Sequence, residues 1–428
     1  MKMMEKLKAV KMFKTYSKKS IQHIYRFAKW TLVSMVTGLT VGGFSTLFAF
    51  MMNSVTDFRS KNDFIILFLP LAGIVTVFLY SIFKYKNDKG TNLVLSTVHA
   101  QSEIPFRMAP LIFVTTILTH LFGGSAGREG AALQLGGSIG NQLGRWMRFD
   151  DADKRVVVLC GMSAAFAALF GTPMAAAVFS MEVVSVGIMY YAALVPCAFS
   201  SLIASYFASN FGIHGDDFSG IVFPELTPLT TVEMIALSIL CAVISIVFVI
   251  MLHSTGDLFR KYLKNPYIRI FLAGCVIVVL TLLFQTRDYN GAGIAVIERA
   301  INGEAVPYAF LVKMIFTAIT IEAGFRGGEI VPSFFIGATF GCTYGAFIGF
   351  SPSVCAAVGL IALFCGVTNC PITSMLISFE LFGAGGIHYF LIAVAVSYFM
   401  SGYYGLYKDQ TIVYSKYKTK FINRKTHQ

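Results

Sequence analysis

The chain has 428 residues, of which 56% are hydrophobic and only 13% are charged. Soluble domains are typically about 45–50% apolar and about 25% charged, so this composition excludes an ordinary soluble globular protein. Lys and Arg exceed Asp and Glu, giving a formal net charge of +12. The basic residues gather at separate loops, which does not match the single basic surface of a nucleic-acid-binding protein.

Long apolar stretches recur along the whole chain. They cover residues 30–52, 64–83, 156–181, 234–252, 270–284 and 387–400. A helix needs roughly 20 apolar residues to cross about 30 Å of hydrocarbon, and several of these stretches approach that length. The sequence therefore predicts an all-α polytopic membrane protein.

The distribution of charge predicts how the chain is oriented. Lys and Arg gather in residues 1–29, 84–89, 145–155 and 260–269 and in the tail after Lys408. Residues 156–259 contain neither Lys nor Arg but include an acidic loop with Asp216, Asp217 and Glu225. Because cytoplasmic loops of membrane proteins are enriched in basic residues, we expect a multi-pass protein of the cell membrane with both termini cytoplasmic. The acidic loop would lie outside, and the number of crossings would be even.

The chain shows no Pro- or Ser-rich linker between its apolar stretches. We therefore expect a single transmembrane domain over residues 30–410. A basic cytoplasmic segment, residues 1–29, would precede it, and a basic cytoplasmic tail, residues 411–428, would follow. The N-terminal segment does not resemble a secretory signal, because no small-residue cleavage site follows its first apolar stretch.

Two segments far apart in the sequence resemble each other. HLFGGSAGREGAALQLGGSIGNQLG (residues 120–144) aligns with IEAGFRGGEIVPSFFIGATFGCTYG (residues 321–345), and five glycines match at a constant offset of 201 residues. Further along, TPMAAAVFSMEV and CPITSMLISFEL match in Pro, Ser and Glu, pairing Glu182 with Glu380. The domain is thus predicted to contain two related halves, about residues 30–215 and 230–410. Glycine-broken helices in paired halves are typical of transporters whose site lies between the repeats, and we expect an inverted arrangement.

Each glycine-rich break is followed by the start of a new helix. A helix N-terminus presents unpaired N–H groups and a partial positive charge, so two such ends aimed at one point would bind an anion. Glycines at positions 127, 130, 327 and 328 would let the backbone approach a small ion closely.

The first break carries Arg128 and Glu129 side by side. Glu129 has two interpretations: a carboxylate that caps its own helix or pairs with Arg128, or a gate that competes with the anion and carries protons. Ionisable residues at membrane depth are functional candidates, which favours the second interpretation. We expect Arg128 to hold the loop or to balance charge near the site.

These motifs resemble those of the CLC anion channels and transporters. GREGA at residues 127–131 is similar to the family's GREGP or GKEGP signature, and GGEIVP at residues 327–332 is similar to its GGxFxP signature. SGYYGLY, ending at Tyr407, resembles the last helix, whose tyrosine faces the pore. The resemblance runs from about residue 30 to 410. It implies a CLC-type inverted-repeat helical bundle whose broken helices meet at the midplane, assembled as a homodimer.

Departures from the family pattern resemble the fluoride-transporting branch. Thr91 stands where a pore serine is usual, Glu329 replaces an apolar residue, and Val183 follows Glu182 where proton-coupled chloride members carry a second glutamate. The resemblance implies a fluoride/proton antiporter that exports fluoride in exchange for protons. A chloride channel or chloride/proton exchanger of the same fold is the alternative.

The candidate site combines both breaks with residues that the resemblance adds. Glu129 is the candidate gating and proton-carrying residue. The candidate anion-binding residues are Thr91, Gly127, Arg128, Gly130, Glu329, Ile330, Val331 and Tyr407. Glu329 could instead cap the following helix or pair with Arg326.

Other residues have simpler explanations. Glu182 and Glu380 are expected to be structural caps or cytoplasmic contacts, and Phe335 is expected to pack, although its ring edge could face an anion. The eight cysteines are expected to be small buried apolar residues, and the seven histidines show no metal-binding spacing. No cofactor is expected beyond the transported fluoride and protons, and nucleic acid is not an expected partner. An intramembrane enzyme would need a nucleophile with its base or a metal cluster, and the sequence offers neither pattern.

Overall fold

The computed structural model describes residues 2–85, 90–99 and 104–426, with side chains described from residue 19 onward. Part of the predicted basic loop, residues 86–89, lies outside the described residues, as do residue 1 and residues 427–428 of the terminal segments. Helices of the first half are α1 (Lys2–Lys61), α2 (Leu69–Ile82), α3 (Thr91–Val98), α4 (Met108–Leu121), α5 (Glu129–Trp146), α6 (Asp151–Phe170), α7 (Pro173–Glu182) and α8 (Leu194–Asn210). Helices of the second half are α9 (Pro228–Tyr262), α10 (Pro266–Phe284), α11 (Ile294–Ile301), α12 (Ala309–Ala323), α13 (Ile330–Ile348), α14 (Pro352–Thr368), α15 (Pro371–Phe382) and α16 (Ile387–Met400). Short 3-10 helices cover Asp63–Phe68 and Tyr191–Ala193.

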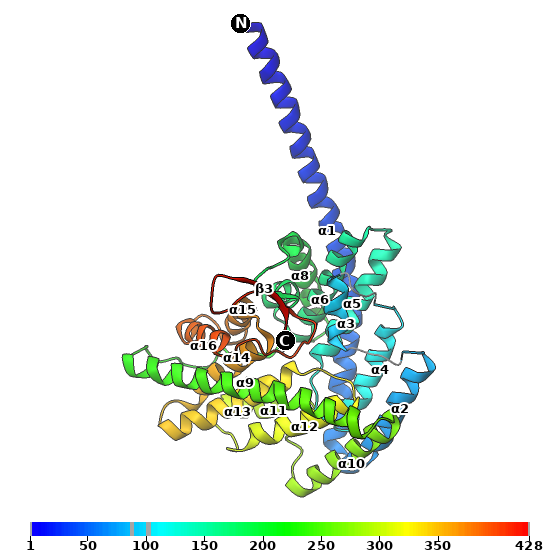
Figure 1. Cartoon of the computed structure of the whole chain (residues 1–428), viewed down its shortest axis with the longest axis vertical. Helices are drawn as coiled ribbons and strands as arrows, with labels where there is room; N and C mark the ends of the chain where they lie inside the picture. Colours follow the sequence, from blue (N-terminus) through cyan, green and yellow to red (C-terminus); the bar gives the residue numbers. More distant parts are fainter. Residues whose placement is uncertain (1, 86–89, 100–103, 427–428) are drawn as a thin grey trace.

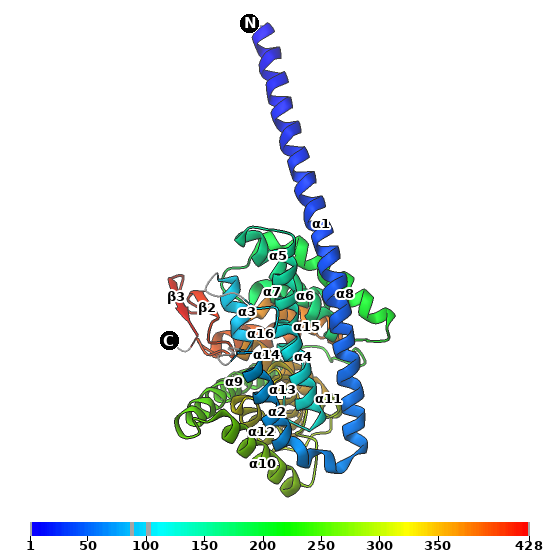
Figure 2. The same cartoon turned by 90° about the vertical axis from the view of Figure 1, so that its right-hand side faces the viewer.

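The helices form one bundle from which the N-terminal part of α1 projects (Figures 1 and 2). The remainder of α1 packs closely against α8, where Gly38 and Gly42 face Ser200 and Ala204. A Cβ at Gly42 would lie 3.0 Å from the Cα of Ala204. Small residues spaced four apart let membrane helices approach each other closely, as they do here.

Six helical segments in the described part of the chain are long and apolar enough to span a membrane. Four of the predicted stretches coincide with such segments, in α1, α2 with its preceding 3-10 turn, α9 and α10. The stretch 156–181 is instead divided between α6 and α7, because Gly171 has a left-handed backbone (φ 67°) and Pro173 starts the next helix. The predicted all-α membrane fold is confirmed, with a break in this third stretch.

The repeat determines how the longest buried helices pack. In the first half, Gly136 of α5 lies against Gly161 of α6, and a Cβ there would be 2.2 Å from the Gly161 carbonyl oxygen. In the second half, Gly337 of α13 lies against Gly359 of α14, with a corresponding distance of 2.4 Å. The matched glycines therefore serve the same helix contact twice, which confirms the two related halves.

The tail, expected only to be a basic segment, contains two short strands. Strands β2 (Thr411–Tyr414) and β3 (Phe421–Lys425) form a hairpin, and β2 pairs in parallel with β1 (Ser185–Val186). Lys416, between the strands, is held by the Asn369 side chain (Nζ–Oδ1 2.5 Å) and the Tyr398 carbonyl (2.9 Å). A small three-stranded sheet is thus added to the helical bundle, on the side where Figure 2 shows β2 and β3.

Candidate functional site

The two glycine-rich breaks meet backbone to backbone. The N–H of Gly127 donates to the carbonyl of Gly328 (2.7 Å), and the N–H of Gly328 donates to the carbonyl of Gly127 (2.8 Å). This isolated antiparallel bridge joins positions that are equivalent in the repeat. A reciprocal pair between equivalent residues requires a local two-fold relation between the halves, as the expected inverted arrangement has.

Only glycine fits at this meeting point. A Cβ at Gly328 would lie 2.4 Å from the backbone nitrogen of Gly130, and a Cβ at Gly130 would lie 2.9 Å from the Cα of Gly328. The start of α5 is therefore in direct contact with the residues that precede α13. Two helix N-termini, each with orphan N–H groups, converge on one small region.

Glu129 is the first residue of α5 and is 1% exposed. Its side chain folds back along the helix start, so that Oε2 accepts the backbone N–H of Arg128 (2.9 Å). The carboxylate thus occupies one backbone N–H at the start of α5, a region whose N–H groups a bound anion would use. The capping and gating interpretations therefore describe two consequences of the same geometry.

Arg128 is tied to its surroundings on three sides. Its guanidinium lies 3.7 Å from Glu129 (Nε–Oε1), donates to the Asn53 side chain (3.1 Å), and donates to the carbonyl of Leu169 (3.4 Å). These contacts join α1, α5 and the end of α6. Arg128 therefore holds the break in place, in line with the role expected for it, and brings a positive charge close to Glu129.

The second break places a different residue at its helix start. Glu329 is the N-cap residue of α13, yet its side chain makes no cap hydrogen bond to the described part of the chain. The Arg326 guanidinium stacks on the Tyr80 ring, 4.1 Å from the ring centroid. Ile330 and Val331 are buried in the first turn of α13. Among the described residues the Glu329 side chain thus makes no cap bond to α13, and its role at the site stays a prediction.

Thr91 begins α3 and reaches the first break from the side. Its hydroxyl donates to the carbonyl of Gly130 (3.4 Å) and accepts from the Gln134 side chain (3.4 Å). Gln134 was not predicted as a site residue, although it is a lone amide in an otherwise apolar stretch of α5. Its Oε1 is buried and lacks a hydrogen-bond partner among the residues that the structure describes.

Tyr407 is buried, and within the described part of the chain its hydroxyl has no hydrogen-bond partner. Its backbone is fixed on both sides: Leu406 N–H donates to the Val367 carbonyl (2.9 Å), and the Thr426 hydroxyl donates to the Tyr407 carbonyl (2.7 Å). A further bond, from Asp409 N–H to the Asn92 side chain (3.0 Å), ties this segment to the start of α3. The C-terminal hairpin thus helps to hold Tyr407 beside the helix that carries Thr91.

Glu182 and Glu380 are confirmed as structural caps, although each caps a helix of the opposite half. Glu182, at the end of α7, accepts the N–H groups of Ile372 (3.0 Å) and Thr373 (2.8 Å) at the start of α15. Glu380, in α15, accepts the N–H groups of Met174 and Ala175 at the start of α7, both at 2.9 Å. This exchange repeats the two-fold relation of the glycine bridge.

Phe335 is fully buried and packs as expected. The ammonium of Lys313 lies 5.1 Å from its ring centroid and donates to the carbonyls of Tyr289 (3.1 Å) and Gly291 (2.7 Å). The ring therefore supports the loop before α11. Seven of the eight cysteines are buried and Cys275 is half-buried, which confirms their predicted environment.

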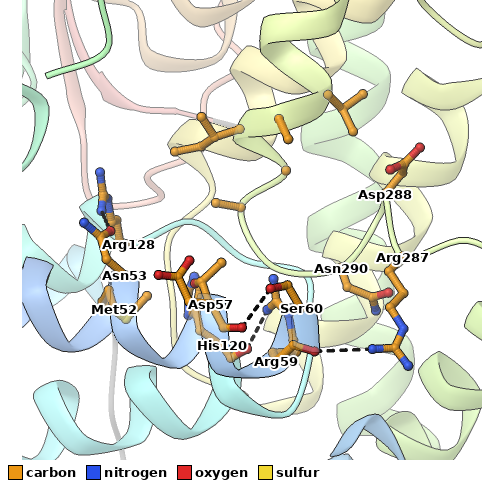
Figure 3. A pocket seen from close by; sticks show the side chains of 16 residues that line it. Met52, Asn53, Asp57, Arg59, Ser60, His120, Arg128, Arg287, Asp288 and Asn290 are labelled. Carbon is orange, nitrogen blue, oxygen red and sulfur yellow. Dashed lines mark hydrogen bonds between the residues drawn. The ribbon is translucent and has the colours of Figure 1, made fainter. Parts of the chain in front are cut away.

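A cavity of about 590 Å³ opens beside Arg128 (Figure 3). Its lining combines Arg59 and Arg287 with Arg128, and includes Asp57 and Asp288. Arg59 donates to the carbonyl of His120 (2.5 Å). The three arginines outnumber the two aspartates, so this cavity would favour anions near the first break.

The family model for the voltage gated chloride channel matches residues 72–402. The chain belongs to the CLC family. The "Chloride/fluoride channel protein" of Pseudomonas syringae pv. tomato is 32% identical over 400 residues, which cover 91% of this chain and 88% of that relative. The solved structure of a CLC-type fluoride/proton antiporter is 31% identical, with a TM-score of 0.87 over 90% of this chain and 98% of that one. A slow cyanobacterial Cl⁻/H⁺ antiporter, 20% identical with a TM-score of 0.76 over 87% of this chain and 94% of that one, shows the CLC fold alone.

Proposed function

We propose that this CLC protein is a fluoride/proton antiporter that exports fluoride in exchange for protons across the cell membrane. One observation carries the proposal: the Glu129 carboxylate accepts the backbone N–H of Arg128 at the point where two helix N-termini present their N–H donors. An ionised Glu129 excludes an anion from those donors, and a protonated Glu129 releases them. Anion binding and proton binding at this residue are therefore linked, and such linkage is the requirement for exchange.

The exchange follows from the charges at the first break. When Glu129 takes up a proton, its side chain loses its attraction for the Arg128 N–H and leaves room for fluoride. The anion then binds the orphan N–H groups of both helix starts. Loss of the proton on the opposite side restores the carboxylate, which displaces the anion. Arg128 keeps the loop in position throughout, because its guanidinium is bonded to α1 and α6.

Fluoride is favoured by the number of hydrogen-bond donors near the helix starts. The Tyr407 hydroxyl and the Thr91 hydroxyl both belong to this region, and Glu329 adds a donor when protonated. The resemblance to the solved fluoride/proton antiporter at 31% identity supports the same substrate. Chloride transport on the same fold is the second candidate, supported by the CLC relatives that carry chloride.

Purified protein in liposomes tests the function directly. We expect fluoride to be transported in strong preference to chloride, and a fluoride gradient to drive protons against their own gradient. Fluoride efflux and internal pH would be recorded together. Chloride flux equal to or greater than fluoride flux would reject the fluoride assignment and favour the chloride alternative. Fluoride flux without proton movement would reject antiport.

The assembly and orientation complete the proposal. The CLC resemblance supports a homodimer with one pathway per subunit, which crosslinking in liposomes would test. The basic termini support a cytoplasmic location for both ends, and the acidic loop at Asp216 would then face outside. The protein acts as a secondary active ion transporter and not as an enzyme. Single-cysteine labelling at each end would test the orientation.

A further inference from the structure

Asp216 lines two neighbouring cavities at once. One is open, about 600 Å³ in volume, and is also lined by Asp217 and Glu298. The other is a narrow space of about 10 Å³ that is also lined by Arg128 and Glu129. A space of roughly 10–15 Å³ holds one water molecule, so the narrow cavity has room for about one. Asp216 therefore lies between an open, acidic cavity and the Glu129 carboxyl group.

The loop that carries Asp216 is fixed on both sides of this residue. Before it, Gly215 lies against Gly171 at the end of α6, where a Cβ on Gly215 would be 2.0 Å from the Phe170 carbonyl oxygen. After it, the N–H of Phe218 donates to the carbonyl of Leu381 (2.9 Å), and its ring stacks on Phe382 at 5.8 Å. Backbone contacts thus hold the carboxyl group at the narrow cavity.

The carboxyl group itself is not engaged by this anchoring. Among the described residues it has no hydrogen bond or ion pair, whereas Asp217 accepts the N–H of Ser219 (2.9 Å) and is exposed. Burial raises the pKa of Asp216, and the Arg128 charge acts in the opposite direction. Hydrogen bonds from Ser219 lower the pKa of Asp217. Asp216 therefore holds a proton more readily than its neighbour does.

We propose that Asp216 is a proton-transfer residue that passes protons between the open cavity and Glu129, a role that rests on the proposed antiport. A hydronium ion in the open cavity gives its proton to the Asp216 carboxylate. Asp216 then donates this proton to a water in the narrow cavity, and that water gives one of its own protons to the Glu129 carboxylate. After the last transfer Asp216 is again a carboxylate, the narrow cavity again holds a neutral water, and the hydronium ion has become water, so the net result is one proton moved from the open cavity to Glu129. Arg128 and Glu129 face Asp216 from the narrow side, and Asp217 and Glu298 face it from the open side.

The test compares Asp216→Asn with Asp217→Asn, which changes the adjacent carboxylate in the same loop. With Asp216→Asn, we expect fluoride-driven proton uptake to fall about tenfold or more near pH 8, since general acid–base groups contribute roughly 10²–10⁴-fold. The loss should shrink towards about pH 5, because abundant hydronium ions can then reach Glu129 without a carrier. Asp216→Glu should restore most of the rate. Asp217→Asn should stay within about twofold of the wild type at every pH, because its carboxylate does not reach the narrow cavity.

Several results would overturn the assignment. The first is a rate of proton uptake in Asp216→Asn equal to that of the wild type across the pH range. The second is an equal loss of this rate in Asp217→Asn. The third is a loss of rate that does not depend on pH and that Asp216→Glu does not restore. The thermal unfolding midpoint of each variant in detergent separates misfolding from a slowed proton step. Wild-type protein is measured first: if it moves no protons with fluoride, the antiport proposal fails. If wild type exchanges normally and Asp216→Asn is unaffected, only the role of Asp216 fails.

Discussion

The two helix breaks have nearly the same backbone but different charges. The residue before α5 is Arg128 (φ −103°, ψ −15°), and its counterpart before α13 is Glu329 (φ −94°, ψ −11°). In the repeat, Glu129 corresponds to Ile330. The first break therefore carries a cation followed by a carboxylate, whereas the second carries a carboxylate followed by an apolar side chain.

This difference separates the two tasks of an exchanger. The shared backbone presents two helix N-termini to one region, and anion binding needs nothing more than this. Coupling to protons needs a titratable group that competes with the anion, and among the described residues the carboxylate that accepts an N–H at its helix start is that of Glu129, whereas Glu329 makes no cap hydrogen bond. Single substitutions at one break should therefore change proton coupling and anion transport separately.

The largest expected effect comes from Glu129→Gln. The amide keeps the size of the side chain but cannot titrate, so proton movement driven by fluoride should fall by about 100-fold or more. Fluoride movement should either stall or continue as an uncoupled leak. Internal pH and fluoride efflux from the same liposomes give both quantities.

Two comparisons make the Glu129 result decisive. A proton gradient should drive fluoride uphill in the wild type and fail to do so in Glu129→Gln. If the variant still couples the two ions normally, Glu129 is only a helix cap, and Glu329 becomes the carrier to test. Val183 cannot take that role, because its side chain does not titrate.

The second effect concerns the backbone that both breaks share. Gly328→Ala would place a Cβ 2.4 Å from the backbone nitrogen of Gly130, so the glycine bridge must open. We expect a loss of about 1–3 kcal/mol in stability, as for other overpacked sites, together with loss of fluoride transport. Gly220→Ala is the control, because no atom of the described residues lies within 4 Å of its added Cβ. Equal thermal midpoints and equal fluxes for the two variants would mean that the bridge is not needed.

The repeated glycines made the contact between the two breaks predictable from the sequence, whereas the partners of the polar residues around it could not be predicted. Matched glycines predicted two helix starts that meet, because few other constraints place glycines at one repeated spacing. Glu182 and Glu380 were correctly predicted as caps, but their partners lie about 190 or more residues away and no local pattern names them. Gln134 was missed because a single amide in a helix gives no periodic signal.

The C-terminal hairpin was missed for a different reason. Its strands, β2 and β3, have four and five residues, too short for alternation to stand out among basic and polar side chains. They are stabilised by the pairing of β2 with β1 and by the hydrogen bond of Lys416 to Asn369, both long-range contacts. Tertiary structure thus decides the conformation of this segment, and local preference does not.

A smaller effect is expected at the second break. Glu329→Gln keeps a hydrogen-bond donor but removes the charge and the titration. We expect fluoride turnover to fall about tenfold, which corresponds to about 1.4 kcal/mol and one hydrogen bond to a charged group. The ratio of fluoride to protons should stay at the wild-type value, because Glu129 is intact. A changed ratio would show that both breaks carry protons.

The reciprocal caps allow a comparison of stability between the halves. Glu182 accepts two N–H groups and the Thr373 hydroxyl, whereas Glu380 accepts two N–H groups only. We therefore expect Glu182→Gln to cost about 1–2 kcal/mol and Glu380→Gln about 1 kcal/mol or less, the range of lost helix caps. Thermal unfolding in detergent measures both, and neither change should alter the ratio of fluoride to protons. The reverse order of stability would contradict the count of hydrogen bonds.

The smallest effect is expected for Thr91→Ser. Thr91 is uncharged and lies outside both breaks, at the start of α3. Serine keeps the hydroxyl that donates to Gly130 and accepts from Gln134, so fluoride transport should remain within about threefold of the wild type. The lost methyl group leaves more room beside the first break, because Thr91 is only 6% exposed in the native packing. A larger space favours a larger anion, so the preference for fluoride over chloride should weaken by a similar factor, measured as the ratio of the two effluxes.

Thr91→Val is the matched variant: it keeps the shape and removes the hydroxyl, and it should therefore slow fluoride more than Thr91→Ser does. If Thr91→Val behaves as the wild type in both rate and preference, the hydroxyl makes no contribution to the anion pathway.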